Sequence, residues 1–258
     1  MQWFFGLDSV MQALIASLFT YAMTALGASL VFFSKKINER FLTAMTGAAA
    51  GIMIAAAFFS LLLPALEYDK SALPVFAVVT LGFLLGGAFI VGSDLFLTKI
   101  NALSQESRKK SALLYSAVTL HNIPEGMAVG VAFASVAAGD VAGVVSALML
   151  AIGIGVQNFP EGVCVAYPLK TQGYGAFKSF FLSQASGIVE IPAAVFGALA
   201  VGVATGLMPW TLSFSAGATI AVVCSELIPE CFEKHKITAN AGVIFGFALM
   251  MLLDVALG

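Results

Sequence analysis

Long apolar segments separated by short polar breaks dominate the sequence. Eight of them are long enough for a helix to cross the core of a bilayer, which takes about 20 residues. These segments are residues 9–33, 41–66, 73–97, 112–137, 141–167, 175–204, 208–230 and 238–257. Charged or turn-forming residues mark the breaks, and the weakest break, near residues 206–209, carries no charge. The pattern predicts an all-α, polytopic membrane protein whose eight transmembrane helices form one domain over residues 1–258.

The composition supports a membrane protein and excludes a soluble one. Of the 258 residues, 60% are hydrophobic and 10% are charged, and the mean hydropathy is +1.00. A soluble domain has about 25% charged residues, so no soluble core could bury this much apolar surface. The lipid bilayer is therefore the expected partner, and no nucleic acid is expected. The three cysteines, Cys164, Cys224 and Cys231, form no CxxC pair and indicate apolar packing rather than disulfides.

The lysine and arginine residues fall almost entirely into alternate loops. Eleven of the twelve lie in one set of loops, and Lys70 alone lies in the other set. The eleven are Lys35, Lys36, Arg40, Lys99, Arg108, Lys109, Lys110, Lys170, Lys178, Lys234 and Lys236. Because positive residues concentrate in cytoplasmic loops, this bias places both termini outside the cytoplasm. Seven spans would put the termini on opposite sides and would remove this bias. The distribution of charges therefore also favours eight spans.

Three pairs of segments resemble each other. Spans three and eight carry two glycines and an aspartate at identical spacing, and residues 51–64 resemble residues 216–229. Spans four and five share the sequence Asn-x-Pro-Glu-Gly. Spans 1–3 thus pair with spans 6–8, and span 4 pairs with span 5. Paired spans are an odd number of crossings apart, so they run in opposite directions and predict an inverted 3+2+3 repeat, an architecture of secondary transporters. Chance recurrence of glycine and aspartate is the alternative.

Two related six-residue motifs lie in the middle of apolar segments. They are His-Asn-Ile-Pro-Glu-Gly at residues 121–126 and Gln-Asn-Phe-Pro-Glu-Gly at residues 157–162. A carboxylate at that depth in a membrane is costly and marks a functional site by default. Helix residues four apart share a face, so the first and fifth residues of each motif project together. The motifs therefore predict a cation site inside the bilayer.

A proline lies in the centre of each motif, at positions 124 and 160. A proline cannot donate a backbone hydrogen bond and clashes with the carbonyl one turn back, so we expect both helices to be broken there. Such breaks survive in a membrane only where they line a cavity or are buried in protein. The prolines thus place a polar cavity at the same depth as the motif carboxylates.

Span six contributes a third carboxylate, Glu190, near its centre. A divalent cation would balance Glu125 and Glu161, and a second could use Glu190. Imidazole, carboxylate and amide groups suit first-row divalent metals better than alkali ions or Cu(I). We expect a first metal position from His121, Glu125, Gln157 and Glu161. We expect an adjacent one from Asn122, Glu125, Asn158, Glu161 and Glu190, with the two motif glutamates bridging. Taken singly, each group could instead bond a neighbouring helix.

Four further acidic residues are candidates for a cation pathway. Glu67 and Asp254 lie at the outer ends of spans two and eight, and Asp94 and Glu226 lie toward the cytoplasmic ends of spans three and seven. We expect these residues to guide the cation in and out. Ordinary interfacial charge is the alternative, and it is strongest for Glu67 and Asp254.

The motifs resemble those of the ZIP metal transporters, particularly the bacterial GufA-like branch. The resemblance covers nearly the whole chain and includes Glu190 and Ser-Glu-Leu-Ile-Pro-Glu at residues 225–230. It implies uptake of zinc, with iron, manganese or cadmium as further substrates, into the cytoplasm through a binuclear site. It also implies an elevator-like movement of spans 1, 4, 5 and 6 against spans 2, 3, 7 and 8. A location in the bacterial cytoplasmic membrane follows, zinc is a substrate rather than a cofactor, and a homodimer is compatible.

The chain departs from the family pattern at two positions and in one loop. Many members have His where Gln157 stands, some have Asp where Asn158 stands, and the 99–111 loop lacks the family's histidine cluster. An intramembrane metalloenzyme is one alternative function, but the HExxH motif of such enzymes is absent. A non-metal solute carrier or a structural assembly protein is the other. The expected function is transport, not enzymatic catalysis.

Overall fold

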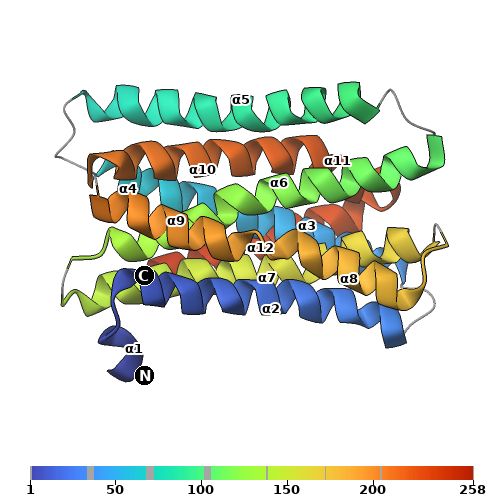
Figure 1. The fold of residues 1–258 in the computed structure, drawn as a ribbon, viewed down its shortest axis with the longest axis horizontal. Helices are drawn as coiled ribbons and strands as arrows, with labels where there is room; N and C mark the ends of the chain where they lie inside the picture. Colours follow the sequence, from blue (N-terminus) through green and yellow to red (C-terminus); the bar gives the residue numbers. More distant parts are fainter. Residues whose placement is uncertain are drawn as a thin grey trace.

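The computed structural model describes residues 2–33, 38–67, 73–101, 106–137, 139–171, 173–203 and 205–257, and in these residues it is all-helical. The α-helices are α1 Gln2–Phe5, α2 Ser9–Phe33, α3 Glu39–Ala56, α4 Leu63–Leu66, α5 Val75–Asn101, α6 Glu106–Ala134, α7 Val141–Thr171, α8 Ala176–Gly187, α9 Glu190–Val203, α10 Met208–Val222, α11 Ile228–Lys234 and α12 Lys236–Leu257. Two π-helical segments, η1 Ala57–Leu62 and η3 Val223–Leu227, and a 3₁₀ turn, η2 Thr205–Leu207, complete the chain. The long helices run side by side along the long axis (Figure 1).

Seven segments of the described chain are long and apolar enough to cross a membrane. They are Ser9–Phe33, Glu39–Leu66, Val75–Phe96, Val141–Tyr167, Ala176–Val201, Met208–Glu233 and Lys236–Ala256. Each matches one of the predicted spans, so the chain is a multi-pass membrane protein. The predicted fourth span falls in α6, where the side chains of residues 106–118 and of His121 lie outside the described residues.

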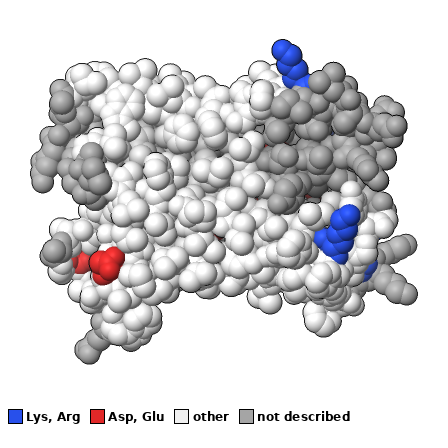
Figure 2. All heavy atoms as spheres, in the orientation of Figure 1, with Lys and Arg blue, Asp and Glu red and all other residues white. Residues whose placement is uncertain are grey.

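Few charged side chains are visible on the described part of the surface. On the face that Figure 2 shows, lysine and arginine side chains lie in one half of the long axis, and acidic side chains lie near the opposite end. The described surface between them is almost entirely uncharged. Both chain termini lie at the same end of the helical bundle (Figure 1).

The expected helix breaks at Pro124 and Pro160 are not found. Helix α6 continues through Pro124, and α7 continues from Val141 to Thr171 past Pro160. The break lies instead in predicted span six, where α8 ends at Gly187 and α9 begins at Glu190. A physical reason is the proline two residues later, since Pro192 cannot donate to the carbonyl of Ile188. This break places the carboxylate of Glu190 at the start of a helix.

Two other prolines are accommodated by π-helical segments. Pro64 follows η1, and Pro229 follows η3. Because proline cannot make the usual bond to the residue four back, the helix widens there: Leu63 N–H donates to Phe58 O, and Ile228 N–H donates to Val223 O. Each of these bonds spans five residues instead of four, and such π-bulges are frequent at functional sites.

Four helix pairs make the most extensive contacts: α3 with α12, α2 with α7, α5 with α10, and α6 with α9. Glycines allow close approach in them. A side-chain carbon added at Gly86 of α5 would collide with the backbone of Phe214 in α10, and one at Gly246 of α12 would collide with the backbone of Ala48 in α3. These close contacts replace the hydrophobic driving force that is missing between helices in lipid.

Candidate metal site

The two motifs and Glu190 meet in the interior of the helical bundle. Asn122 and Glu125 come from α6, Gln157, Asn158 and Glu161 from α7, and Glu190 from the start of α9. All are buried except Glu161, which is partly buried because it lines a cavity. So many polar groups in an apolar interior are unfavourable unless they bind one another or a ligand.

The first contact joins the two motifs directly. The amide Nε2 of Gln157 donates a hydrogen bond to Glu125 Oε1 over 2.6 Å. Each of these side chains is only 3% exposed, so the bond forms away from bulk solvent. A short bond from an amide to a carboxylate is typical of a charge-assisted interaction. The bond places Gln157, the first residue of the second motif, against Glu125, the glutamate of the first motif.

The second contact joins the second motif to Glu190, which is completely buried. Asn158 Nδ2 donates to Glu190 Oε1 over 2.8 Å and also to the backbone oxygen of Thr20 over 3.3 Å. The hydroxyl of Thr20, in α2, donates to the other oxygen of Glu190. Both oxygens of the carboxylate therefore have a donor. A fourth group, Asn122, donates through Nδ2 to the backbone oxygen of Ser186 over 3.1 Å.

The amide side chains of the site also provide oxygen atoms that could bind a ligand. Among the described residues, the side-chain oxygens of Asn122, Gln157 and Asn158 are buried and have no hydrogen-bond partner. Buried polar atoms are normally satisfied, so three unsatisfied amide oxygens at one depth need an explanation. Amide oxygens are good ligands for cations and cannot donate. The set is thus suited to a positively charged ligand.

Among the described residues, the carboxylates alone do not form a metal site. Glu190 interacts electrostatically with both Glu125 and Glu161. Within the described part of the chain, however, no three His, Cys, Asp or Glu side chains gather closely enough to hold a metal ion. The donor set is instead a mixture of carboxylates and amides. The His121 side chain, the predicted imidazole ligand, lies outside the described residues.

Each motif glycine lets a neighbouring helix approach the site. A side-chain carbon at Gly126 would collide with the backbone of Glu190, and one at Gly162 would collide with the backbone of Thr24. Glycine at the end of each motif thus brings α9 against α6 and α2 against α7. These contacts hold Glu190 and the segment around Thr20 next to the amides that bond them.

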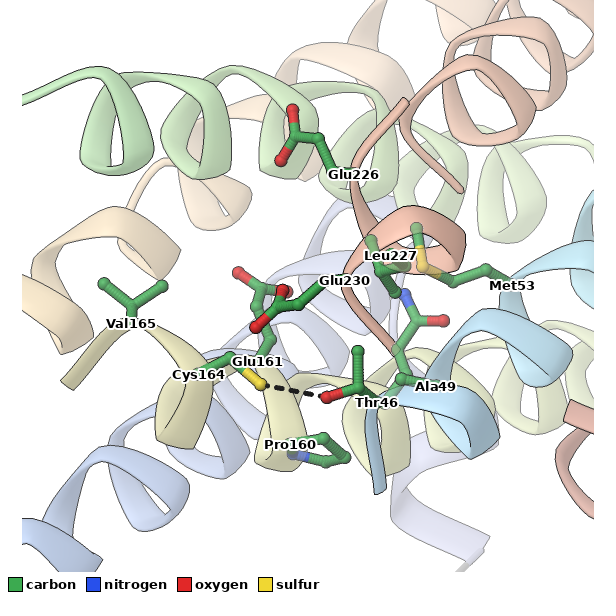
Figure 3. Close-up of a pocket in the computed structure, with 11 residues that line it drawn as sticks. Thr46, Ala49, Met53, Pro160, Glu161, Cys164, Val165, Glu226, Leu227 and Glu230 are labelled. Carbon is green, nitrogen blue, oxygen red and sulfur yellow. Dashed lines mark hydrogen bonds between the residues drawn. The ribbon is translucent and has the colours of Figure 1, made fainter. Parts of the chain in front are cut away.

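A cavity of about 50 Å³ adjoins the site on one side. Gln157 and Glu161 line it from α7, Glu226 lines it from η3, and Glu230 lines it from α11 (Figure 3). Glu226 was predicted to lie on the cation pathway, whereas no role was predicted for Glu230. In the fold, residue 230 lies one helical turn beyond Glu226 and lines the same cavity.

The first cavity leads to a second one of about 170 Å³, and the two share Thr46 and Glu230. The second cavity also contains Glu39 and Glu233, at the start of α3 and near the end of α11. Predicted lysine- and arginine-rich loops flank these helix ends. Acidic side chains therefore connect the polar site to the end of the helical bundle where the lysine- and arginine-rich loops are predicted.

A third cavity, of about 510 Å³, is lined by Ser60, Glu67 and Asp140. Ser60 Oγ donates to Asp254 Oδ1 over 2.7 Å, which links Asp254 to this cavity. Ser60 thus links Asp254 to the cavity that Glu67 lines, and the role of both carboxylates in a cation pathway stays a prediction. Asp94 is exposed on α5 and lines none of these three cavities, so the structure does not bring it to the site.

Four contributing residues were missed by the sequence analysis. Thr20 and Ser186 bond the site through a hydroxyl and a backbone oxygen, and neither has a motif around it. Cys164 and Glu230 line the first cavity. Spacing was the available signal for two of them: Cys164 lies three residues after Glu161 and Glu230 four residues after Glu226, which places each pair on one helix face.

The fold and the site together define a multi-pass membrane protein with a buried carboxylate–amide site suited to a cation. Comparison with known proteins specifies this class. The family model described as ZIP Zinc transporter matches residues 97–254. The chain is 35% identical to "Zinc transporter ZIP11" of Homo sapiens over 98% of its length and 99% of the relative. It is 37% identical to "Zinc transporter GufA" of Myxococcus xanthus, covering 95% of the chain and 98% of the relative.

A third relative, "Zinc transporter ZIPB" of Bordetella bronchiseptica, is 37% identical over 92% of the chain and 79% of its own length. The chain therefore belongs to the ZIP family of zinc transporters. This confirms the resemblance seen in the motifs. The family is one of transporters and not of enzymes, and zinc is its substrate rather than a cofactor.

Proposed function

We propose that the chain transports divalent metal cations, chiefly zinc, toward the cytoplasm through an intramembrane site with two metal positions. Iron, manganese and cadmium are further candidate substrates. Family membership and relatives named as zinc transporters support the substrate. The observation that carries the site is the buried contact of Gln157 with Glu125 and of Asn158 with Glu190. Carboxylate and amide oxygens converge there from three helices.

The first metal position would use His121, Glu125, Gln157 and Glu161. The second would use Asn122, Glu125, Asn158, Glu161 and Glu190. In the structure the amide nitrogens of Gln157 and Asn158 face the carboxylates. A half-turn of each amide would present its oxygen to a cation held by those same carboxylates. Two ionised glutamates balance the charge of one divalent ion, which offsets the cost of keeping them charged in a membrane.

We propose eight transmembrane helices in one domain over residues 1–258, with α6 as the fourth span. An inverted 3+2+3 repeat would exchange α2 with α8–α9, α3 with α10, α5 with α12, and α6 with α7. Under this exchange the contact of α2 with α7 becomes that of α9 with α6, and the contact of α3 with α12 becomes that of α10 with α5. All four are the most extensive contacts in the bundle. The π-helical segments also exchange, each just before a proline.

We propose that both termini face outward and that the lysine- and arginine-rich end faces the cytoplasm of a bacterial inner membrane. The cation would arrive through the cavity with Glu67 and Asp254 and leave past Glu226 and Glu230. Two termini at one end of the bundle fit an even number of crossings (Figure 1). Asp94 stays a proposed exit residue on sequence grounds alone. We propose a homodimer that uses an exposed apolar face, and α5 and α12 are the least buried of the seven apolar segments.

Zinc flux into proteoliposomes tests the proposal. Glu125→Gln and Glu161→Gln preserve side-chain shape and remove the charge that balances the cation, so each should abolish zinc uptake. Asp8→Asn, at an exposed residue before α2 that lines none of the three cavities, is the control and should retain most of the flux. Normal uptake by either glutamine variant would reject the assignment.

A further inference from the structure

Cys164 lies in the cavity next to the proposed transport site. It comes from α7, three residues after Glu161, and faces the same space as Glu161 and Glu230 (Figure 3). Its sulfur lies 3.2 Å from the hydroxyl oxygen of Thr46 in α3. The sequence predicts that this cysteine is a small apolar packing residue. In the structure it borders a cavity whose lining combines apolar side chains such as that of Met53 with polar groups.

Cys164 lines a cavity that continues into a second one. Thr46 and Glu230 line both this cavity and the next one toward the basic end of the chain. The cavity volume of about 50 Å³ exceeds the roughly 10–15 Å³ needed for one water-sized probe, so a partly hydrated ion has room. A cation that moves from the carboxylates toward that end would pass the sulfur.

A second observation, at a residue of the proposed first metal position, points to a ligand in this cavity. Gln157 lines it, is only 3% exposed, and has a side-chain oxygen with no hydrogen-bond partner among the described residues. Its nitrogen is already committed to Glu125. The buried oxygen is therefore an acceptor without a donor, on the same helix face as Glu161 and Cys164. A cation would satisfy it.

We propose that Cys164 is a soft ligand for divalent cations on the cytoplasmic side of the transport site, and that it favours cadmium over zinc. The inference rests on the proposed function and adds a specificity-determining residue to it. Binding forms a metal–sulfur bond and breaks the S–H bond, and the proton passes to a carboxylate that lines the cavity. Glu161 and Glu230 line the same cavity as the thiol. Thiolate ligands select softer metals than carboxylates and amides do.

The test compares two proteins that differ only at this residue. Cys224→Ser/Cys231→Ser leaves Cys164 as the only cysteine, and the matched control adds Cys164→Ser. Each protein is titrated with cadmium alone and with zinc alone, and the near-ultraviolet absorption of cadmium–thiolate bonds is recorded. We expect this absorption only in the protein with Cys164. We also expect the control to bind cadmium about tenfold more weakly, with zinc affinity changed less than about threefold.

The inference is overturned if the two proteins give the same cadmium absorption, or if they bind cadmium with the same affinity. Zinc flux in proteoliposomes separates this failure from failure of the proposed function. Flux that persists in both proteins while Cys164 has no effect rejects the cysteine and leaves the transport site standing. Absence of zinc flux from the unsubstituted protein would overturn the proposed function and this inference with it.

Discussion

At the scale of single residues, the carboxylates of the proposed site are held by groups that carry little sequence signal. The motif glutamates could be predicted because ionisable residues in apolar segments are rare and costly. The same holds for Glu190. Thr20 could not be predicted, because a threonine in an apolar helix normally bonds its own backbone. The Thr20 hydroxyl also lies 3.0 Å from the backbone oxygen of Ser17, and only the packing of α2 against α7 and α9 brings Glu190 within its reach as well.

Thr20→Val should weaken zinc binding about tenfold, because a hydrogen bond to a charged group contributes about 1.5–3 kcal/mol. Valine has nearly the same shape as threonine, so packing is kept while the donor to Glu190 is lost. Isothermal titration with zinc measures the change. Thr24→Val is the control, since the Thr24 hydroxyl reaches only the backbone of its own helix, over 3.5 Å. Equal affinity of Thr20→Val and the unsubstituted protein would show that Glu190 needs no help from α2.

At the scale of elements, hydropathy predicts the helices well and their interruptions poorly. Length and apolar composition set which segments can cross a membrane, so the spans match closely. The response of a helix to proline is decided by its neighbours. Pro124 and Pro160 lie inside continuous helices, Pro64 and Pro229 follow π-helical widening, and Pro192 follows a break. The same residue type thus gives three outcomes that local sequence does not distinguish.

Gly86→Ala should lower the thermal stability of the protein in detergent. The added methyl group would collide with the backbone of Phe214 and lie 2.9 Å from the backbone nitrogen of Ala218, so α5 and α10 must separate. Overpacking of this kind costs about 1–3 kcal/mol, which lowers the melting temperature by several degrees.

The matched control is Gly92→Ala on the same helix, where an added side-chain carbon has nothing within 4 Å. It should leave stability unchanged or raise it slightly, because alanine favours a helix more than glycine does. A melting temperature that is the same for both variants would contradict close packing of α5 on α10.

At the scale of the whole molecule, the cavities are distributed unequally around the proposed site. Gln157 and Glu161 border the cavity that leads toward Glu39 and Glu233. The cavity with Glu67 is separated from them along α6 and α7 by buried apolar residues. They are Ala128, Val129, Val131, Leu150, Ala151 and Ile154. A cation that crossed the molecule between these cavities would have to pass this apolar layer.

The extensive contacts of α2 with α7 and of α6 with α9 are compatible with the inverted repeat, which stays a proposal. The distribution of cavities could not be predicted from the sequence, because it depends on how the helices pack against one another. Hydropathy therefore indicates which segments can cross a membrane, whereas packing decides which cavities border the site.

The most direct test of the central claim is the position of bound zinc in a crystal of the protein, located by its anomalous scattering. The account predicts a peak between Glu125 and Glu161, within about 2.0–2.2 Å of a carboxylate oxygen from each, as zinc–carboxylate bonds require. A second peak is expected toward Asn158 and Glu190. Zinc found only at the surface, with Glu125 and Glu161 turned away from any shared ion, would contradict the account.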